Sequence, residues 1–193
     1  TLSFDIALSE LVLPLTVGAR ILLVDRDTVR DIVRLRKLID AEAITIMQAT
    51  PATWRMLLDL GWAGKPGMRI ISTGEALPRD LADRLLPCAP SLWNLYGPTE
   101  TTVYSALCRV EPGSGPIIVG RPVDNTVLRI VDQRMQPLPV GVPGEWLIGG
   151  VGLAAGYRGR PDLTAEKFID DPFSDAPDAR LYRTGDLALW RED

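Results

Sequence analysis

The chain has 193 residues, 46% hydrophobic and 24% charged, so it is long and apolar enough to bury a sizeable core. Its net charge of -4 gives no cluster of Lys and Arg for phosphates, so we expect no nucleic acid partner and no membrane partner. The chain contains no histidine, which excludes Ser-His catalysis and histidine-based metal sites and leaves positioning and charge as means of catalysis.

Up to about residue 105, apolar runs of strand length alternate with segments of helix length. We expect strands at 20–24, 44–47, 68–72 and 91–96, and helices at about 5–14, 28–40, 51–60 and 78–86. Pro51 and Pro78 stand where prolines open helices. This alternation predicts an α/β fold in which a parallel sheet is covered by flanking helices, a flavodoxin-like layer.

After residue 105 the sequence is punctuated by Gly and Pro, with short β-type runs at 126–132 and 145–150. The pattern predicts a small antiparallel sheet or barrel. We therefore divide the chain into an α/β layer at 1–105 and a β-rich, barrel-like portion at 106–193.

The two cysteines, Cys88 and Cys108, have no metal-ligand spacing and cannot form a disulfide framework. We expect both to be buried small hydrophobes in a reducing, cytoplasmic environment. The sequence has no apolar run of eighteen residues and no basic leader, which predicts a soluble chain without a targeting segment.

The stretch "NLYGPTE" (94–100) ends an apolar run with a hydroxyl and a carboxylate. Ligands of parallel sheets bind beyond the carboxyl ends of the strands, where Thr99 could donate to a phosphate oxygen. Glu100 would repel a phosphate unless a hard cation such as Mg²⁺ stood between them. The alternative is that Thr99 and Glu100 only cap the next element.

Two further stretches have the character of a site. In "YRTGDL" (182–187) a glycine precedes Asp186, whose carboxylate could accept hydrogen bonds from two ribose hydroxyls, although Gly-Asp is also a common turn. "ISTGEALP" (71–78) indicates a strand end, a glycine turn and a helix start.

Together these motifs resemble those of nonribosomal peptide synthetase adenylation domains, which belong to the adenylate-forming enzyme superfamily. The resemblance rests on "FDIA" (4–7), "NLYGPTE" (94–100), "GEWLIGGVGLAAGYRGRPDLT" (144–164) and "YRTGDL" (182–187), in that order. The linking segments "VGRPVDNTVLRIVD" and "PLPVGVPGE" agree. One departure is Ala155-Gly156-Tyr157, where the family usually has Arg-Gly-Tyr.

The resemblance implies ATP and Mg²⁺ as cofactors. Glu100 would hold the magnesium and Thr99 would contact the phosphates, while Asp186 would bind the ribose. Tyr96 would stack on adenine and Asn94 would bond its exocyclic amine. The backbone of Gly74, Glu75 and Ala76 would close the other side of the base. The α/β layer would thus carry the substrate pocket and the adenine and magnesium loop, and the β-rich portion would end in the ribose-binding stretch.

The resemblance also implies an amino acid pocket. Its lining would be Asp5, Ile6, Ser9, Gln48, Ile71, Thr73, Leu95, Val103 and Tyr104. Asp5 and Ser9 stand four residues apart and so share a helix face. Because Asp5 is the only charged member, a neutral substrate side chain of modest size is expected. Alternatively, Asp5 is a first-turn carboxylate that follows a capping Ser3.

The implied reaction joins an amino acid to ATP, giving aminoacyl-AMP and pyrophosphate, and then passes the acyl group to the phosphopantetheine thiol of a peptidyl carrier domain. Family members have a phosphate loop upstream of "FD" and a C-terminal subdomain with a lysine, so we expect an internal fragment of the large N-terminal subdomain. This fragment would need the rest of the adenylation domain as a partner and would be inactive alone.

Two other functions stay open. A related carboxylic acid ligase, such as an acyl-CoA synthetase, would have no use for the charge of Asp5. A noncatalytic binding module is distinguished by whether the isolated chain binds ATP.

Overall fold

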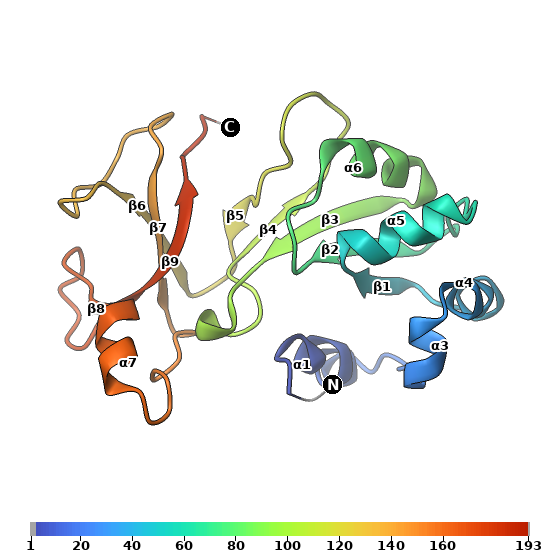
Figure 1. Ribbon diagram of the computed structural model, residues 1–193, viewed down its shortest axis with the longest axis horizontal. Helices are drawn as coiled ribbons and strands as arrows, with labels where there is room; N and C mark the ends of the chain where they lie inside the picture. The colour runs from blue at the N-terminus through green and yellow to red at the C-terminus, as the bar shows by residue number, and fades with distance from the viewer. Residues whose placement is uncertain (1–2, 193) are drawn as a thin grey trace. The chain divides into compact units, whose positions relative to one another are not determined.

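The computed structural model describes residues 3–192, which form two compact units (Figure 1). The first unit consists of the chain up to Tyr96 together with Ala106–Arg121. The second consists of Gly97–Ser105 together with the chain from Pro122 onward. The predicted division into functional regions at 1–105 and 106–193 stays a prediction.

The first unit is a mixed sheet with helices packed against it. Three strands, β1 (Ile46–Ala49), β2 (Arg69–Thr73) and β3 (Ser91–Tyr96), run parallel, and β4 (Ala106–Arg109) pairs antiparallel with β3. The short β5 (Arg121–Pro122) completes the sheet, in the order β1-β2-β3-β4-β5. The predicted parallel layer is confirmed for the last three of its four expected strands, whereas β4 and β5 were missed.

The helices of the first unit follow the expected segments with breaks. They are α1 (Ile6–Leu11), α2 (Leu13–Thr16), α3 (Arg26–Arg30), α4 (Ile32–Ala41), α5 (Pro51–Asp59), α6 (Arg79–Leu85) and the 3-10 helix η1 (Leu86–Cys88). The helix expected at 28–40 is interrupted at Asp31, whose side chain accepts from the backbone N–H groups of Val33 and Arg34 and so caps α4. The helix expected at 5–14 is likewise divided, next to Pro14, which has no N–H for a helical hydrogen bond.

The strand expected at 20–24 is wrong, because this segment has no regular secondary structure. A β-strand needs a neighbour to accept and donate its backbone hydrogen bonds. Within residues 3–192, no strand pairs with 20–24, and the Leu23 side chain stays 77% exposed. An apolar run thus suggested a strand where the fold provides no pairing partner.

Helices α5 and α6 cover one face of the sheet and enclose the core of the first unit (Figure 1). Ile70 of β2 and Leu92 of β3 are paired neighbours that point into this core, where both are almost completely buried. Trp54 of α5 is fully buried, stacks on Trp62 and donates from Nε1 to the carbonyl of Ile71 at 3.1 Å. A side chain of α5 therefore fixes the backbone of β2.

The second unit contains a four-stranded antiparallel sheet in the order β6-β7-β9-β8. Its elements are the 3-10 helix η2 (Thr99–Thr101), β6 (Thr126–Val131), β7 (Gly144–Gly150), α7 (Pro161–Lys167), β8 (Phe168–Asp170) and β9 (Arg180–Ala188). Val131, Leu147 and Leu181 form its buried centre. The expected α/β layer followed by a β-rich portion is confirmed, although α7, β8 and β9 were not predicted.

No helix within residues 3–192 has the length and apolar character needed to cross a membrane. Both cysteines are free and partly buried, rather than buried completely as expected. Burial is the main cause that raises the pKa of both thiols, which disfavours the reactive thiolate.

Candidate functional site

The strand register of the first unit gathers several predicted pocket residues on one sheet face. Gln48 of β1 is paired with Ile71 of β2, and Thr73 of β2 is paired with Leu95 of β3. Ile71 and Thr73 are two residues apart, so all four side chains point to the face opposite Ile70 and the helix-covered core. Side chains from three strands thereby form one polar and apolar surface near the carboxyl ends of the strands.

The loop after β2 and the end of β3 carry the residues predicted to contact adenine. Gly74, Glu75 and Ala76 are exposed, and they follow Thr73 directly. Asn94 is only 5% exposed, and its Nδ2 donates to the carbonyl of Ile118 at 3.0 Å. That bond uses an amide hydrogen and not Oδ1, the acceptor that an exocyclic amine would need.

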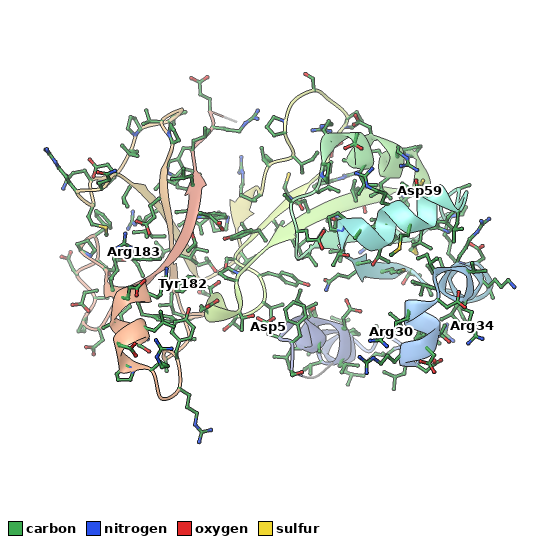
Figure 2. The ribbon with its side chains drawn as sticks, in the orientation of Figure 1. Asp5, Arg30, Arg34, Asp59, Tyr182 and Arg183 are labelled. Atoms are coloured by element: carbon green, nitrogen blue, oxygen red, sulfur yellow. The ribbon has the colours of Figure 1, made fainter. Side chains whose placement is uncertain are left out.

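Asp5 stands at the N-cap position of α1, in the first unit (Figure 2). Its side chain makes no capping hydrogen bond to this helix. The alternative placed Asp5 in the first turn of a helix capped by Ser3, whereas α1 begins at Ile6, one residue after Asp5. The hydroxyl of Ser9 donates to the carbonyl of Ile6 at 2.7 Å. The role of Asp5 in the substrate pocket stays a prediction.

In the second unit, residues 97–105 form a tightly closed loop. A Cβ atom at Gly97 would lie 2.4 Å from the carbonyl oxygen of Val103, so only glycine fits there. Thr102 and Val103 both have left-handed backbone angles, with φ of 61° and 66°. The hydroxyls of Thr101 and Ser105 are 2.6 Å apart in a buried position. Close packing and a buried hydrogen bond thus hold two strained residues next to Glu100.

Glu100 lies in η2 and interacts with a loop that follows β7. The hydroxyl of Tyr157 donates to Oε1 of Glu100 at 2.5 Å, and the Tyr182 hydroxyl lies 3.5 Å from that of Tyr157. Burial, and then hydrogen bonding to Glu100, raises the pKa of Tyr157. Burial also raises the pKa of Tyr182, followed by its interaction with Tyr157. Both phenols are therefore protonated near neutral pH, and Tyr157 serves as a donor to the carboxylate.

The loop that carries Tyr157 is anchored at several backbone positions. The N–H of Ala154 donates to the carbonyl of Glu100 at 2.8 Å, and the Thr102 hydroxyl donates to the carbonyl of Gly152 at 2.6 Å. The guanidinium of Arg180 donates to the carbonyls of Ala154 and Ala155 at 3.0 and 3.1 Å. The backbone near Glu100 and the loop of Tyr157 are therefore tied together within the second unit.

Asp186 lies in an irregularity of the antiparallel sheet. Leu147 is paired with Arg183 and Glu145 with Leu187, so β9 has two more residues than β7 between these pairs. The Thr184 hydroxyl donates to the carbonyl of Trp146 at 2.7 Å and accepts from the N–H of Asp186 at 3.0 Å. Gly185 provides the left-handed φ of 80° that this bulge requires. The bulge presents Asp186 at an exposed position.

Beside the bulge, Arg183 of β9, labelled in Figure 2, is paired with a carboxylate. It donates through two nitrogens to both carboxylate oxygens of Glu145, at 2.9 and 2.6 Å. This hydrogen bonding is the main cause that raises the pKa of Arg183. A bidentate pair of this kind fixes geometry as well as adding attraction. It joins β7 and β9 where their register changes.

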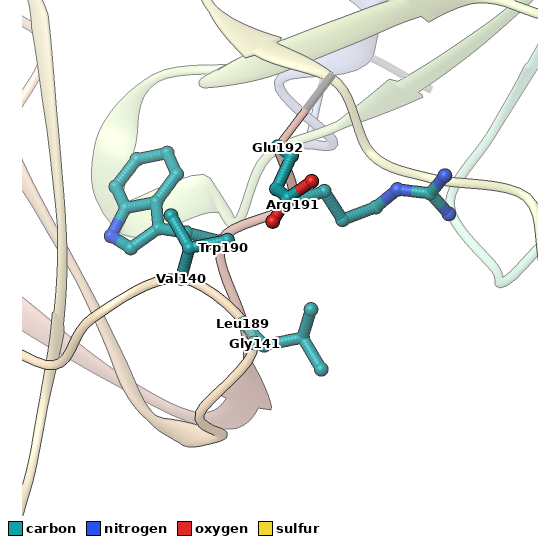
Figure 3. A pocket seen from close by; sticks show the side chains of 6 residues that line it. All are labelled: Val140, Gly141, Leu189, Trp190, Arg191 and Glu192. Atoms are coloured by element: carbon teal, nitrogen blue, oxygen red, sulfur yellow. The ribbon is translucent and has the colours of Figure 1, made fainter.

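A hollow in the second unit lies apart from the predicted residues. It is lined by Val140, Gly141, Leu189, Trp190, Arg191 and Glu192 (Figure 3). The N–H of Gly141 donates to the carbonyl of Trp190 at 2.9 Å. Because none of the predicted site residues lines it, this hollow does not enter the proposed site.

The predicted residues are distributed over both units. The strand residues, Asp5, Ile6, Ser9, Asn94, Tyr96 and the Gly74 loop belong to the first unit. Val103, Tyr104, Thr99, Glu100 and Asp186 belong to the second. Their roles stay predictions. Sequence reasoning assigned no role to Tyr157, Tyr182, Arg180 or Thr184, although all four lie in or beside the stretches singled out.

Comparisons with known proteins find similarity to the family that these motifs resemble. The family model described as AMP-binding enzyme matches residues 1–158. The chain is 46% identical over 194 residues to the dimodular nonribosomal peptide synthase of Bacillus subtilis (strain 168), covering 100% of this chain and 8% of that protein. It is 43% identical over 191 residues to the PKS-NRPS hybrid synthetase ATPKS of Aspergillus niger, covering 98% of this chain and 10% of that protein.

Two solved structures share the fold. One is a holo four-domain nonribosomal peptide synthetase bound to AMP and glycine, with a TM-score of 0.92 and 44% identity over 100% of this chain and 14% of that chain. The other is the N-terminal subdomain of Klebsiella oxytoca NpsA in complex with 3-hydroxybenzoyl-AMSN, with a TM-score of 0.82 and 25% identity over 99% of this chain and 50% of that chain. With its motifs in order along both units and a family model that covers most of its length, the chain belongs to the AMP-binding enzyme family.

Proposed function

We propose that this chain is part of the adenylation domain of a nonribosomal peptide synthetase. The complete domain forms aminoacyl-AMP and pyrophosphate from an amino acid and ATP, and then passes the acyl group to the phosphopantetheine thiol of a peptidyl carrier domain. The observation that carries the proposal is the similarity of the whole chain to a synthetase structure bound to AMP and glycine. The chain spans only 8% of the Bacillus subtilis synthase and 14% of the four-domain synthetase. The rest of the adenylation domain is its proposed partner.

Within this function, adenine and ribose have separate binding residues. Asn94, Tyr96 and the Gly74, Glu75 and Ala76 backbone bind adenine, and Asp186 binds the ribose hydroxyls. The acceptor capacity of Asn94 Oδ1 and the exposure of Asp186 support these roles. Thr99, exposed at the start of η2, contacts the phosphates.

Glu100 is the proposed ligand of Mg²⁺. Within residues 3–192, no group of three or more His, Cys, Asp or Glu side chains could form a metal cage. A lone carboxylate nevertheless fits Mg²⁺, which is usually bound through one or two carboxylates together with substrate phosphates and water. Glu100 is partly exposed, and the hydrogen bond to Tyr157 leaves lone pairs on its carboxylate for a cation. When bound, the cation neutralises charge on the phosphates.

The residues of this chain contribute orientation and charge rather than a covalent intermediate. Asp5 faces the ammonium group of the amino acid, which leaves the substrate carboxylate free to attack the α-phosphate of ATP. Holding two reactants in an attacking geometry removes much of the entropic barrier. Ile6, Ser9, Gln48, Ile71, Thr73, Leu95, Val103 and Tyr104 line the side-chain pocket. The sheet face formed by Gln48, Ile71, Thr73 and Leu95 supports that lining.

A second candidate is activation of a carboxylic acid that lacks an α-amino group. It is favoured by the likeness to NpsA, whose subdomain is in complex with 3-hydroxybenzoyl-AMSN. The two functions differ in what they require of Asp5, because an acid without an ammonium group offers that carboxylate no partner. The cytoplasmic location expected from the two cysteines also stays a prediction.

The test is pyrophosphate exchange by the complete domain, measured over a panel of amino acids and matching acids without the amino group. Exchange that depends on one or a few amino acids is expected. Exchange with the deaminated acids alone would select the second candidate, and ATP binding without any exchange would select a noncatalytic module. The isolated chain is expected to give no exchange.

A further inference from the structure

The contact between Tyr157 and Glu100 has the geometry of a strong hydrogen bond. The Oη to Oε1 distance of 2.5 Å lies in the range of hydrogen bonds from a hydroxyl to an ionised carboxylate. We propose that Tyr157 is a positioning residue that fixes the carboxylate of Glu100 for a divalent cation bound together with the nucleotide. The inference rests on the proposed metal role of Glu100 and assigns Tyr157 an effect through that carboxylate.

Tyr157 is itself held from several sides within the second unit. Its ring and that of Phe168 pack in a T-shaped arrangement with 5.6 Å between centroids, and its N–H donates to the Thr164 hydroxyl at 2.9 Å. Arg180 fixes the two residues that precede Gly156 through their carbonyls. The phenol therefore has little freedom, and a rigid donor can orient the carboxylate that accepts from it.

The backbone of Glu100 is fixed by the same loop. Its carbonyl accepts from the N–H of Ala154 at 2.8 Å, while its side chain accepts from Tyr157. Backbone and side chain are thus both tied to residues 154–157. With Oε1 engaged by the phenol, the carboxylate presents its remaining lone pairs in one orientation, and less side-chain entropy is lost when a cation binds.

Tyr182 supports this arrangement more weakly. Its hydroxyl lies 3.5 Å from that of Tyr157, which is longer than an ordinary hydrogen bond between hydroxyls. The Phe168 ring lies against both tyrosines, with 5.2 Å between its centroid and that of Tyr182. Tyr157 therefore contributes more than Tyr182 to positioning the carboxylate of Glu100.

The test uses four variants of the complete adenylation domain: Tyr157→Phe, Tyr182→Phe, Glu100→Gln and the double variant of Tyr157→Phe with Glu100→Gln. The affinity for Mn²⁺ in the presence of a nonhydrolysable ATP analogue is measured by electron paramagnetic resonance, which does not depend on turnover. Loss of a group that orients a metal ligand typically lowers metal affinity about 10- to 100-fold. We expect Tyr157→Phe to weaken Mn²⁺ binding by about 10-fold, Tyr182→Phe to weaken it less, and the double variant to bind no more weakly than Glu100→Gln alone.

Ser174→Ala is the control for general loss of a hydroxyl in the second unit, since the Ser174 hydroxyl accepts from the nearby N–H of Ala176 in an exposed loop. It should leave the Mn²⁺ affinity unchanged. Thermal unfolding shows whether each variant is folded. If Tyr157→Phe does not fold, the Mn²⁺ affinity of Tyr182→Phe is the second measurement. Unchanged or tighter Mn²⁺ binding in folded Tyr157→Phe, while Glu100→Gln weakens it, overturns this inference alone. Unchanged binding in Glu100→Gln overturns the metal role on which it rests.

Discussion

The two units place their candidate site residues in different ways. In the first unit, Gln48, Ile71, Thr73 and Leu95 share a face because the parallel strands are paired in a particular register. In the second, hydroxyl groups of other residues hold the candidate residues. The Tyr157 hydroxyl donates to the carboxylate of Glu100, and the Thr184 hydroxyl accepts from the backbone N–H of Asp186. Strand register persists when one side chain is replaced, whereas an arrangement built on single hydroxyls does not. Substitutions of supporting residues should therefore affect the second unit more.

The largest effect is expected in the first unit, at a residue that is proposed to bind substrate directly. Losing one partner of a desolvated charge pair typically costs about 2–5 kcal/mol, so Asp5→Ala should lower kcat/KM for the amino acid by roughly thirty- to several-thousand-fold. The matching acid without an amino group should lose far less. Steady-state kinetics with both substrates measures this asymmetry, and equal losses would favour the carboxylic acid ligase.

In the second unit, Glu100→Gln keeps the shape of the side chain and removes its charge. Activity should fall about a hundredfold, the scale of losing one electrostatic group worth about 3 kcal/mol at a reacting phosphate. Pyrophosphate exchange over a range of Mg²⁺ concentrations is the measurement. If the rate and its magnesium dependence stayed as in the unaltered protein, Glu100 would not be the metal ligand.

A smaller effect is expected for Thr184→Val, which removes the hydroxyl that organises the bulge but leaves the carboxylate of Asp186 in the sequence. A neutral hydrogen bond contributes about 0.5–1.5 kcal/mol, so the KM for ATP should rise about 2- to 12-fold. The KM for the amino acid should not change. Thr184→Ser, which keeps the hydroxyl, should leave the KM for ATP near that of the unaltered protein. Asp186→Ala gives the largest increase in the KM for ATP expected at this bulge. A shift in the amino acid KM would place this bulge in another site.

The smallest effect on activity is expected for Trp54→Phe, a supporting residue of the first unit. The variant loses the hydrogen bond to the carbonyl of Ile71 and some buried volume, which should lower the free energy of unfolding by about 1–3 kcal/mol. Because the strand pairing of β2 remains, kcat/KM should change little. Urea unfolding and steady-state kinetics test both parts. A large change in substrate specificity would show that register alone does not place the pocket wall.

Strands and helices with strong local signals were predictable from the sequence. The runs that became β1, β2 and β3 have apolar cores bounded by turns, and α5 begins at Pro51, as predicted. The failures depend on distant partners. Residues 20–24 have the composition of a strand without a paired neighbour, whereas β4 was missed although β3 pairs with it.

Only those residues of the candidate site that lie in recognisable motifs were predictable from the sequence. The stretches at 94–100 and 182–187 directed attention to Glu100 and Asp186, since a carboxylate beside a glycine turn is visible in one sequence. Tyr157 donates to Glu100 across 57 positions of the chain, and no periodicity encodes such a pairing. Thr184 is adjacent in sequence to the turn, but its role depends on the register shift between β7 and β9.

The strained loop next to Glu100 bears on how substrate choice could change during evolution. Val103 combines a branched side chain with a left-handed backbone, a conformation that costs about 1–3 kcal/mol at a residue that is not glycine. The same residue is proposed to line the substrate pocket. Asparagine or glycine tolerates this backbone better, so a mutation there could reshape the pocket while relieving strain. New specificity at this position would then arise without the loss of stability that usually limits adaptive change.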